Sequence, residues 1–299
     1  MRLIDLHAHT TASDGVLSPQ ELVRFAKDCN ISVLAVTDHD TLEGLPAAMA
    51  EASQVGLEVV TGVEITAHVG DLEIHILGHF IDPDDNQLAA FLASSRHDRI
   101  ERAHRMIAKL WALGLPLDAD EVLSMARGSS VGRPHVARAM IRRGYVTSMK
   151  EAFDRYLTTG KPGYVERSRI PAFGVIRTIK EAGGVPSLAH PGQYSHDEII
   201  PSLVQHGLMG LEVYHLEHDT ESLFRYERAC LRYGLLAVGG SDYHGTPGLR
   251  SSGLGRSLVP EAKFEQLRAA ASASRTTASG CKGEEGSRIP RDQAGQGSR

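Results

Sequence analysis

The chain has 299 residues, 41% of them hydrophobic, which is enough for one large α/β domain or a barrel that carries an insertion. A formal net charge of −5 excludes a protein built chiefly to coat nucleic acid, but it allows a local basic pocket for a small phosphorylated substrate. Cys29, Cys230 and Cys281 are far apart and odd in number, so no disulfide framework is implied. With no signal-peptide pattern and no apolar run of membrane-spanning length, we expect a cytoplasmic protein that does not enter a membrane.

Short apolar runs alternate with helical patterns through most of the chain. The predicted strands are 2–6, 31–36, 57–63, 72–80, 185–189, 208–213 and 235–238. The helices predicted around them are 19–29, 41–54, 172–182, 197–206, 220–233 and 261–271. This succession predicts a parallel sheet or barrel with right-handed crossovers.

The pattern changes between residues 84 and 165, where helical periodicity dominates and no strand is evident. The helices predicted there are 87–113, 118–125, 134–143 and 149–157. We interpret 84–165 as a helical insertion into a barrel that is formed by 1–83 and 166–272. Residues 273–299 are poor in apolar side chains, so we expect a disordered tail.

Residues that can bind metal ions gather at the ends of the predicted strands. They are His7, His9, His39, Glu64, His75, His190, Asp242 and His244, with Asp14 following soon after the first pair. A single histidine in such a place is usually structural, but a series at successive strand ends indicates a site on the C-terminal rim of a barrel. Imidazole and carboxylate ligands without cysteine favour two or three catalytic divalent ions, with Mn²⁺ expected and Fe²⁺ or Zn²⁺ as alternatives. A carboxylate such as Glu64 can bridge two of them.

The ordered motifs resemble those of the PHP (polymerase and histidinol phosphatase) superfamily across residues 1–255. The matching segments are Asp-Leu-His7-Ala-His9-Thr, Thr-Asp-His39, Gly-Val-Glu64, His75, Ala-His190-Pro-Gly and Gly-Ser-Asp242-Tyr-His244. The resemblance implies an α/β fold, a distorted (β/α)7 barrel with a trinuclear metal site. It implies catalytic roles for Glu64, His190 and Asp242.

The resemblance also implies how the ligands divide among the ions. One ion would be held by His7, His9, Glu64 and Asp242; a second by Glu64, His75 and His190; and a third by Asp14, His39 and His244. Many members of the superfamily have histidine where this chain has Asp14, so the third position is the one at which this chain departs from the commoner pattern.

Two further segments resemble the subgroup that contains RNase AM and the nucleoside 3′,5′-bisphosphate and AMP phosphatases. These are Gly-Arg133-Pro-His135 and Thr-Gly-Lys161-Pro-Gly-Tyr. Arg133 could simply start a helix as a solvated residue, but an arginine fork also matches phosphate oxygens. The resemblance favours substrate binding by Arg133, His135 and Lys161, and it implies that the insertion forms part of the substrate site of the catalytic barrel.

Two other features have simpler interpretations. Arg96, Arg99, Arg102 and Arg105 recur at helical spacing, which is typical of a solvated, charged face, although a stripe facing a nucleotide is the alternative. Glu212 falls near a strand end, where its carboxylate could orient a ligand.

We therefore expect a metal-dependent phosphoesterase that hydrolyses the 5′-phosphate of nucleoside 5′-monophosphates or 3′,5′-bisphosphates by a metal-activated hydroxide. Short 5′-phosphorylated RNA is a further candidate substrate, and no obligate protein partner is expected. One alternative is a phosphatase of a non-nucleotide such as histidinol phosphate. The other is a PHP module that binds metal and catalyses nothing.

Overall fold

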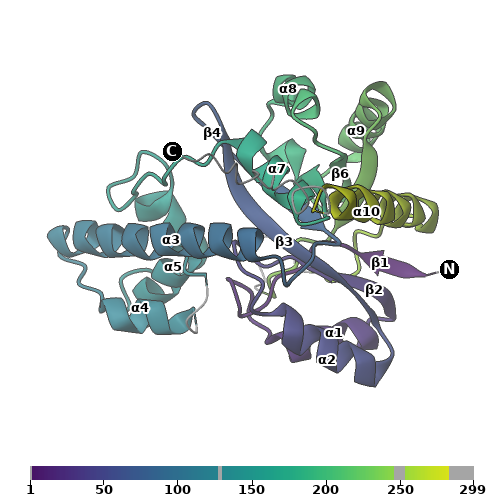
Figure 1. Ribbon diagram of the computed structural model, residues 1–299. Coiled ribbons are helices and arrows are strands. Elements are labelled where there is room, and N and C mark those ends of the chain that lie inside the picture. Colours follow the sequence, from purple (N-terminus) through teal and green to yellow (C-terminus); the bar gives the residue numbers. More distant parts are fainter. Residues whose placement is uncertain (1, 127–129, 246–252, 283–299) are drawn as a thin grey trace, which may run out of the picture.

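A computed structural model describes residues 2–126, 130–245 and 253–282, and within these ranges seven strands form one sheet (Figure 1). The strands are neighbours in chain order. They are β1 Leu3–Asp5, β2 Ile31–Val36, β3 Glu58–Val69, β4 Leu72–His79, β5 Val185–Leu188, β6 Gly210–His215 and β7 Leu236–Gly240. Each lies where the sequence predicts a strand, although β3 continues to Val69, past its predicted end at residue 63.

Strand β4 runs against its neighbours. β1 to β3 pair in parallel, as do β5 to β7, whereas β4 is antiparallel to both β3 and β5. Only Gly70, with φ of +59°, and Asp71 separate β3 from β4, and so short a connection joins only antiparallel strands. The prediction of a parallel sheet is therefore wrong for β4. Because of the reversal, β4 begins at the rim where the parallel strands end, and His75 lies near that rim.

Hydrogen bonds between the two ends of the sheet close it into a barrel. Leu6 N donates to Gly239 O at 3.1 Å, and Ala8 forms a parallel bridge with Tyr243. The buried carboxylate of Asp5 accepts from Ser241 N at 2.9 Å, which ties the two ends together again. The predicted distorted barrel is confirmed. Its closure brings residues after β1 beside residues after β7.

Helices cover the outside of the barrel. They are α1 Pro19–Asp28, α2 Leu45–Val55, α7 Ala172–Glu181, α8 Ile200–Gln205 and α9 Thr220–Tyr233, with the short 3₁₀ turns η2 Pro191–Gln193 and η3 Asp197–Ile199 before α8. The predicted start of α1 is a capping box, in which Ser18 Oγ accepts from Glu21 N and the Glu21 carboxylate accepts from Ser18 N. Side chains such as Leu22, Ile176 and Tyr226 are fully buried against the strands.

The segment between β4 and α7 has a hydrophobic cluster of its own. Its helices are α3 Asn86–Ala112, α4 Ala119–Met125, α5 Arg133–Arg142, α6 Met149–Ala152 and the π-helical turn η1 Phe153–Leu157. Met106, Leu110, Val136 and Met140 are buried in this cluster. The long α3 extends from the barrel to α4 and α5 (Figure 1). No helix in the described part of the chain, α3 included, has an apolar stretch long enough to cross a membrane.

Helix α10 (Glu261–Lys282) packs against the barrel at the end opposite the ligand-bearing rim. Phe264 and Leu267 are buried among strand residues that include Ile4 and Val60. At the start of β3, Glu58 accepts a hydrogen bond from Arg268 Nη2 at 2.7 Å. The predicted end at residue 271 is wrong, because α10 continues into the segment expected to be disordered. Within this added length Arg275 donates to Phe80 O at 2.8 Å, which anchors the helix to the barrel. Residues 283–299 lie outside the described ranges.

The packing of α10 predicts a large loss of stability on truncating its central aromatic residue. Phe264 is fully buried, so we expect Phe264→Ala to lower the free energy of unfolding by about 3–5 kcal/mol. Phe224→Ala, at a residue 63% exposed on α9, is the matched control and should change it by about 0.5 kcal/mol or less. Urea denaturation measures both. Equal losses in the two variants would show that α10 does not seal the barrel.

Candidate metal centre

The carboxylate of Glu64, fully buried on β3, lies at the centre of the site. Its Oε2 atom is 3.4 Å from His7 Nε2, 3.2 Å from His9 Nε2 and 3.1 Å from His39 Nδ1. Its Oε1 atom is 2.7 Å from His75 Nδ1 and 2.9 Å from His190 Nε2. Both oxygens therefore face ring nitrogens, and this one side chain joins histidines from several strands.

The first group of possible ligands spans the closure of the barrel. His7 and His9 follow β1, and Asp242 follows β7. Asp242 Oδ1 lies 3.4 Å from His7 Nε2 and 3.3 Å from His9 Nε2. With Glu64 these residues bring four ligand atoms within 4.8 Å of one another, as the sequence predicts for the first ion.

The second group lies at the other oxygen of Glu64. His75 Nδ1 is 3.3 Å from His190 Nε2, and both atoms contact Glu64 Oε1. The structure thus brings together the three residues predicted for the second ion. His39 also lies within reach of Glu64 and His75, and the sequence gives no sign of this proximity.

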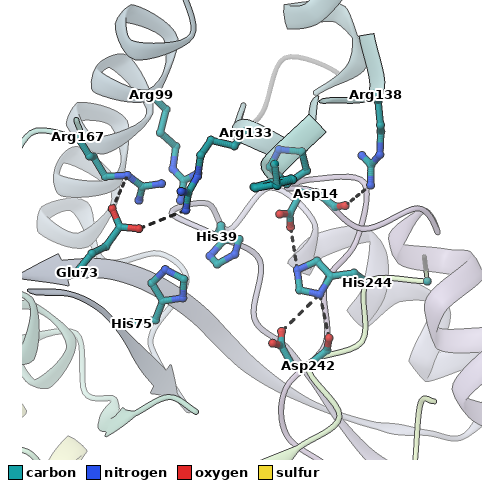
Figure 2. A pocket seen from close by; sticks show the side chains of 14 residues that line it. Asp14, His39, Glu73, His75, Arg99, Arg133, Arg138, Arg167, Asp242 and His244 are labelled. Atoms are coloured by element: carbon teal, nitrogen blue, oxygen red, sulfur yellow. Dashed lines mark hydrogen bonds and ion pairs between the residues drawn. The ribbon is translucent and has the colours of Figure 1, made fainter. Parts of the chain in front are cut away.

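The third group combines Asp14 with three histidines. Asp14 Oδ1 is 3.2 Å from His244 Nε2, and the rings of His9 and His244 stack with their centroids 4.1 Å apart (Figure 2 shows the Asp14–His244 pair). His39 completes this group, so His9 and His39 each lie between two possible ion positions. The division of ligands among ions stays a prediction.

Local backbone geometry turns these side chains inward. His7 and His9 alternate along an extended segment, so both point to the same side. His190 has φ of +28° and Asp242 of +50°, conformations that are uncommon for residues other than glycine. At Gly240 a Cβ atom would lie 2.3 Å from His7 N, so only glycine lets β7 approach the histidine segment closely enough.

The donor atoms of the site fit divalent cations. Within the described ranges, His7 Nε2, His9 Nε2, His39 Nδ1, Glu64 Oε2 and Asp14 Oδ1 are buried and make no hydrogen bond. Each such atom costs about 1–3 kcal/mol when left unsatisfied. Because these atoms come from neighbouring groups and are imidazole or carboxylate atoms, two or three divalent ions would satisfy them together.

The charges within the site already favour cations. Burial alone would raise the pKa of Glu64, but the imidazoles of His39, His75 and His7 hold it well below its usual range. Burial lowers the pKa of His190 to about 4 despite the Glu64 carboxylate, so this ring is neutral and free to bind metal at pH 7. At His9, Asp242 and Glu64 overcome the effect of burial and raise the pKa to about 9. The carboxylates thus attract positive charge to this position.

A cavity of about 290 Å³ opens beside the possible ligands (Figure 2). On one side it is lined by Asp14, His39, His75, Asp242 and His244, with Arg138 beside Asp14, and on the other by Glu73, Arg99, Arg133, Phe153 and Arg167. Burial would raise the pKa of Glu73, but Arg167 and Arg133 lower it to about 2, so its carboxylate is ionised. Arg138 donates to the backbone oxygen of Asp14 at 2.6 Å.

The interpretation of the α3 arginines as a solvated face is wrong for two of them. Arg99 is 6% exposed and donates from Nε to Asp40 Oδ2 at 2.5 Å, and Arg102 is 3% exposed and donates to Val165 O. Arg96 is partly buried and Arg105 is exposed. Buried charge is rare unless it is paired, and the partner of Arg99 comes from the loop after β2, far away in sequence.

The predicted substrate residues differ in their surroundings. Arg133 lines the cavity, with its guanidinium 3.6 Å from Glu73 Oε1. His135 is buried and accepts a hydrogen bond from Gly132 N at 3.0 Å, so it caps the helix that presents Arg133. Lys161 is exposed in a turn, and neither it nor His135 is among the described residues that line the cavity. Their contact with substrate stays a prediction.

The sequence interpretation misses Glu73, Arg138 and Arg167. A signal was available for Glu73, because it lies two residues before His75 on the same strand and so faces the same side. Arg167 follows the insertion in a segment without regular structure, and no pattern marks it.

The unsatisfied buried atoms predict that metal removal destabilises the fold. One ion at a free concentration about 100-fold above its Kd adds about 2.7 kcal/mol to the stability of the native state. We expect a chelator to lower the Tm by roughly 5–10 °C, and added Mn²⁺ to restore it. Differential scanning calorimetry measures the shift, with Mg²⁺ as the control for a non-specific ionic effect. An unchanged Tm would contradict a metal centre here.

Comparisons with known proteins agree with this geometry. Residues 5–166 match the family model described as the PHP domain. The 3′,5′-nucleoside bisphosphate phosphatase of Chromobacterium violaceum is 36% identical over 250 residues, covering 82% of this chain and 88% of the relative. A 5′-3′ exoribonuclease of Haemophilus influenzae is 36% identical over 245 residues, covering 80% of this chain and 89% of the relative.

Solved structures show the same fold. A Chromobacterium violaceum protein described as an amidohydrolase, solved with bound sulfate and no metal, has a TM-score of 0.82 at 34% identity, covering 90% of this chain and 96% of that one. A protein from Bifidobacterium adolescentis, assigned as a metal-dependent phosphoesterase, has a TM-score of 0.83 at 29% identity with the same coverage. The ligand motifs, the barrel and these matches together show that this chain belongs to the PHP domain family.

Proposed function

We propose that this protein is a metal-dependent phosphoesterase that hydrolyses the 5′-phosphate of nucleoside 5′-monophosphates and 3′,5′-bisphosphates, and of short 5′-phosphorylated RNA. One observation carries the proposal: groups of cation ligands and a cluster of arginines face each other across one cavity. A substrate with two phosphates fits this arrangement, with one phosphate at each side. The names of the two enzyme relatives support the same substrate class.

The metal side of the cavity provides the hydrolytic chemistry. His7, His9, Glu64 and Asp242 would hold one ion, Glu64, His75 and His190 a second, and Asp14, His39 and His244 a third. When bound, such ions lower the pKa of water and neutralise charge on a phosphoryl group. Glu64 supports this as a shared ligand, since each of its oxygens contacts a different set of imidazoles. Mn²⁺ suits this donor set, and Fe²⁺ or Zn²⁺ also would.

The opposite side of the cavity binds the second phosphate. Arg167 Nε and Nη1 are buried and, within the described ranges, make no hydrogen bond, and both atoms lie 3.8 Å from a carboxylate. Arg99, Arg133 and Arg167 together carry more positive charge than Glu73 and Asp40 neutralise. A phosphate group accepts bidentate hydrogen bonds from such guanidinium groups.

The arginine cluster also weighs against histidinol phosphate. That molecule carries an ammonium group and an imidazole ring but no second phosphate, so it offers no anion to pair with the guanidinium groups of Arg99, Arg133 and Arg167. Like charges in a partly buried cavity repel strongly, so a second phosphate is favoured over an ammonium group.

A substrate panel tests the proposal. We expect phosphate release from adenosine 3′,5′-bisphosphate to exceed that from AMP and that from histidinol phosphate, with 5′-phosphorylated oligoribonucleotides cleaved at the 5′ end. The Glu64→Gln variant should lose at least about 10²-fold in kcat, because a neutral amide cannot replace a carboxylate shared between cations. Malachite-green detection measures the phosphate released by the wild type and by Glu64→Gln. Chromatography of the products shows where the oligoribonucleotides are cleaved. Absence of hydrolysis across the panel, with Mn²⁺ supplied, would favour a non-catalytic metal-binding module instead.

A second prediction concerns the anion-binding side. Arg167→Met should raise the KM for adenosine 3′,5′-bisphosphate by about 10–100-fold, because the variant loses a charge-assisted hydrogen bond to the second phosphate. The KM for AMP, which has no second phosphate, should change much less. Arg169→Met is the matched control, because Arg169 is exposed and pairs with Glu166 outside the cavity. Equal effects of Arg167→Met on the two substrates would contradict the assignment of the second phosphate.

A further inference from the structure

Strand β6 supplies none of the predicted ligands, yet it places two polar side chains inside the barrel. Glu212 is fully buried and His215 is 4% exposed. The register of β6 against β7 shifts between Glu212 and Tyr214, so the bulge turns both Glu212 and His215 inward. His215 Nε2 lies 3.7 Å from Asp242 Oδ2. A buried carboxylate without a role in folding or function would be costly, which makes the contacts of Glu212 informative.

One oxygen of Glu212 holds the first histidine of the site. Glu212 Oε1 lies 3.0 Å from His7 Nδ1. A carboxylate only accepts, so the Nδ1–H group of His7 donates, and the lone pair is left on Nε2. His7 Nε2 is the atom that faces Glu64 Oε2 and Asp242 Oδ1. The contact thus selects the ring orientation and the tautomer that can bind a cation.

The other oxygen holds the backbone of a second possible ligand. Glu212 Oε2 accepts from His190 N at 2.6 Å. His190 has φ of +28°, a conformation that needs support from its surroundings. The ring of His190 then reaches Glu64 Oε1 at 2.9 Å. The Glu212 carboxylate therefore hydrogen-bonds to a residue after β1 and to a residue after β5. These two residues lie on opposite sides of the β6–β7 pair.

We propose that Glu212 is a positioning residue of the metal centre, which fixes His7 and His190 in the geometry that binds cations. The inference rests on the metal ligands of the proposed function, but not on any particular substrate. Carboxylates hydrogen-bonded to a ligating histidine typically contribute 10–100-fold to metal affinity. Glu212 differs from that simple case because its second oxygen constrains another ligand through the backbone.

The test compares metal binding by Glu212→Gln, Glu212→Asp and a matched control. Glu227→Gln is the control, because Glu227 also contacts β6, through Tyr214 Oη at 3.0 Å, but on the outer helix α9. We expect Glu212→Gln to weaken the tightest Mn²⁺ site by about 10–100-fold in competition with a chelator, and Glu227→Gln to change it less than twofold. The absorption bands of the Co²⁺-loaded protein should also change in Glu212→Gln, a signature that a purely structural role would not move.

Wild-type affinity and an unchanged Co²⁺ spectrum in Glu212→Gln would overturn the proposal. If Glu212→Gln fails to fold, Glu212→Asp, which keeps the charge on a shorter side chain, provides the same comparison. Nitrogen NMR of the Zn²⁺-loaded wild-type protein needs no variant: we expect His7 to bind the ion through Nε2 with Nδ1 protonated, and coordination through Nδ1 would overturn the proposal. None of these measurements uses a phosphoester, so a failure of the proposed activity would leave them interpretable.

Discussion

The site depends on keeping one negative charge, that of Glu64, buried inside the barrel. An isolated carboxylate there would be neutralised or expelled, since burial alone strongly disfavours the ionised form. The surrounding imidazoles make the charge tolerable, and each comes from a different position on the rim. The barrel, the reversal of β4 and the close approach allowed by Gly240 can all be understood as ways of bringing these rings to the two oxygens of Glu64.

In the proposed function, the barrel and the helical insertion share the binding of a phosphorylated molecule. The barrel rim offers ligands for cations, and α3 and α5 offer arginines for anions. Asp40 connects the two parts, because it follows His39, accepts from Arg99 Nε at 2.5 Å and also accepts from Thr66 N. The buried Asp40–Arg99 ion pair therefore couples the position of the insertion to the loop that carries His39, and it would hold the proposed cation and anion sites at a fixed spacing.

Much of the site could be predicted from the sequence, because its ligands obey local rules. His7 and His9 alternate along a strand exit, and Glu64 and Asp242 follow apolar runs, so their common location follows from the barrel. Arg99 and Arg167 could not be assigned in this way, since their burial depends on Asp40 and Glu73, which lie far away in sequence. The sequence places Glu212 near a strand end, where it could orient a ligand, but it does not say which ligands. The contacts with His7 and His190 depend on the bulge in β6, which leaves no periodic signal. The extension of α10 to Lys282 could not be predicted from composition either, because it includes a long-range contact, that of Arg275 with Phe80 O.

Closure of the barrel by its first and last strands has a consequence for how the protein folds. The pairing of Leu6 with Gly239 and the packing of Phe264 on Ile4 join residues more than about 230 positions apart, and contacts of such high sequence separation form slowly. A nascent chain that has produced His7, His9, His39 and Glu64 still lacks His190 and Asp242. It holds only part of the proposed set of metal ligands until the last strand docks. If these residues bind ions as proposed, full cation loading would require the closed barrel and so the native topology of the whole chain.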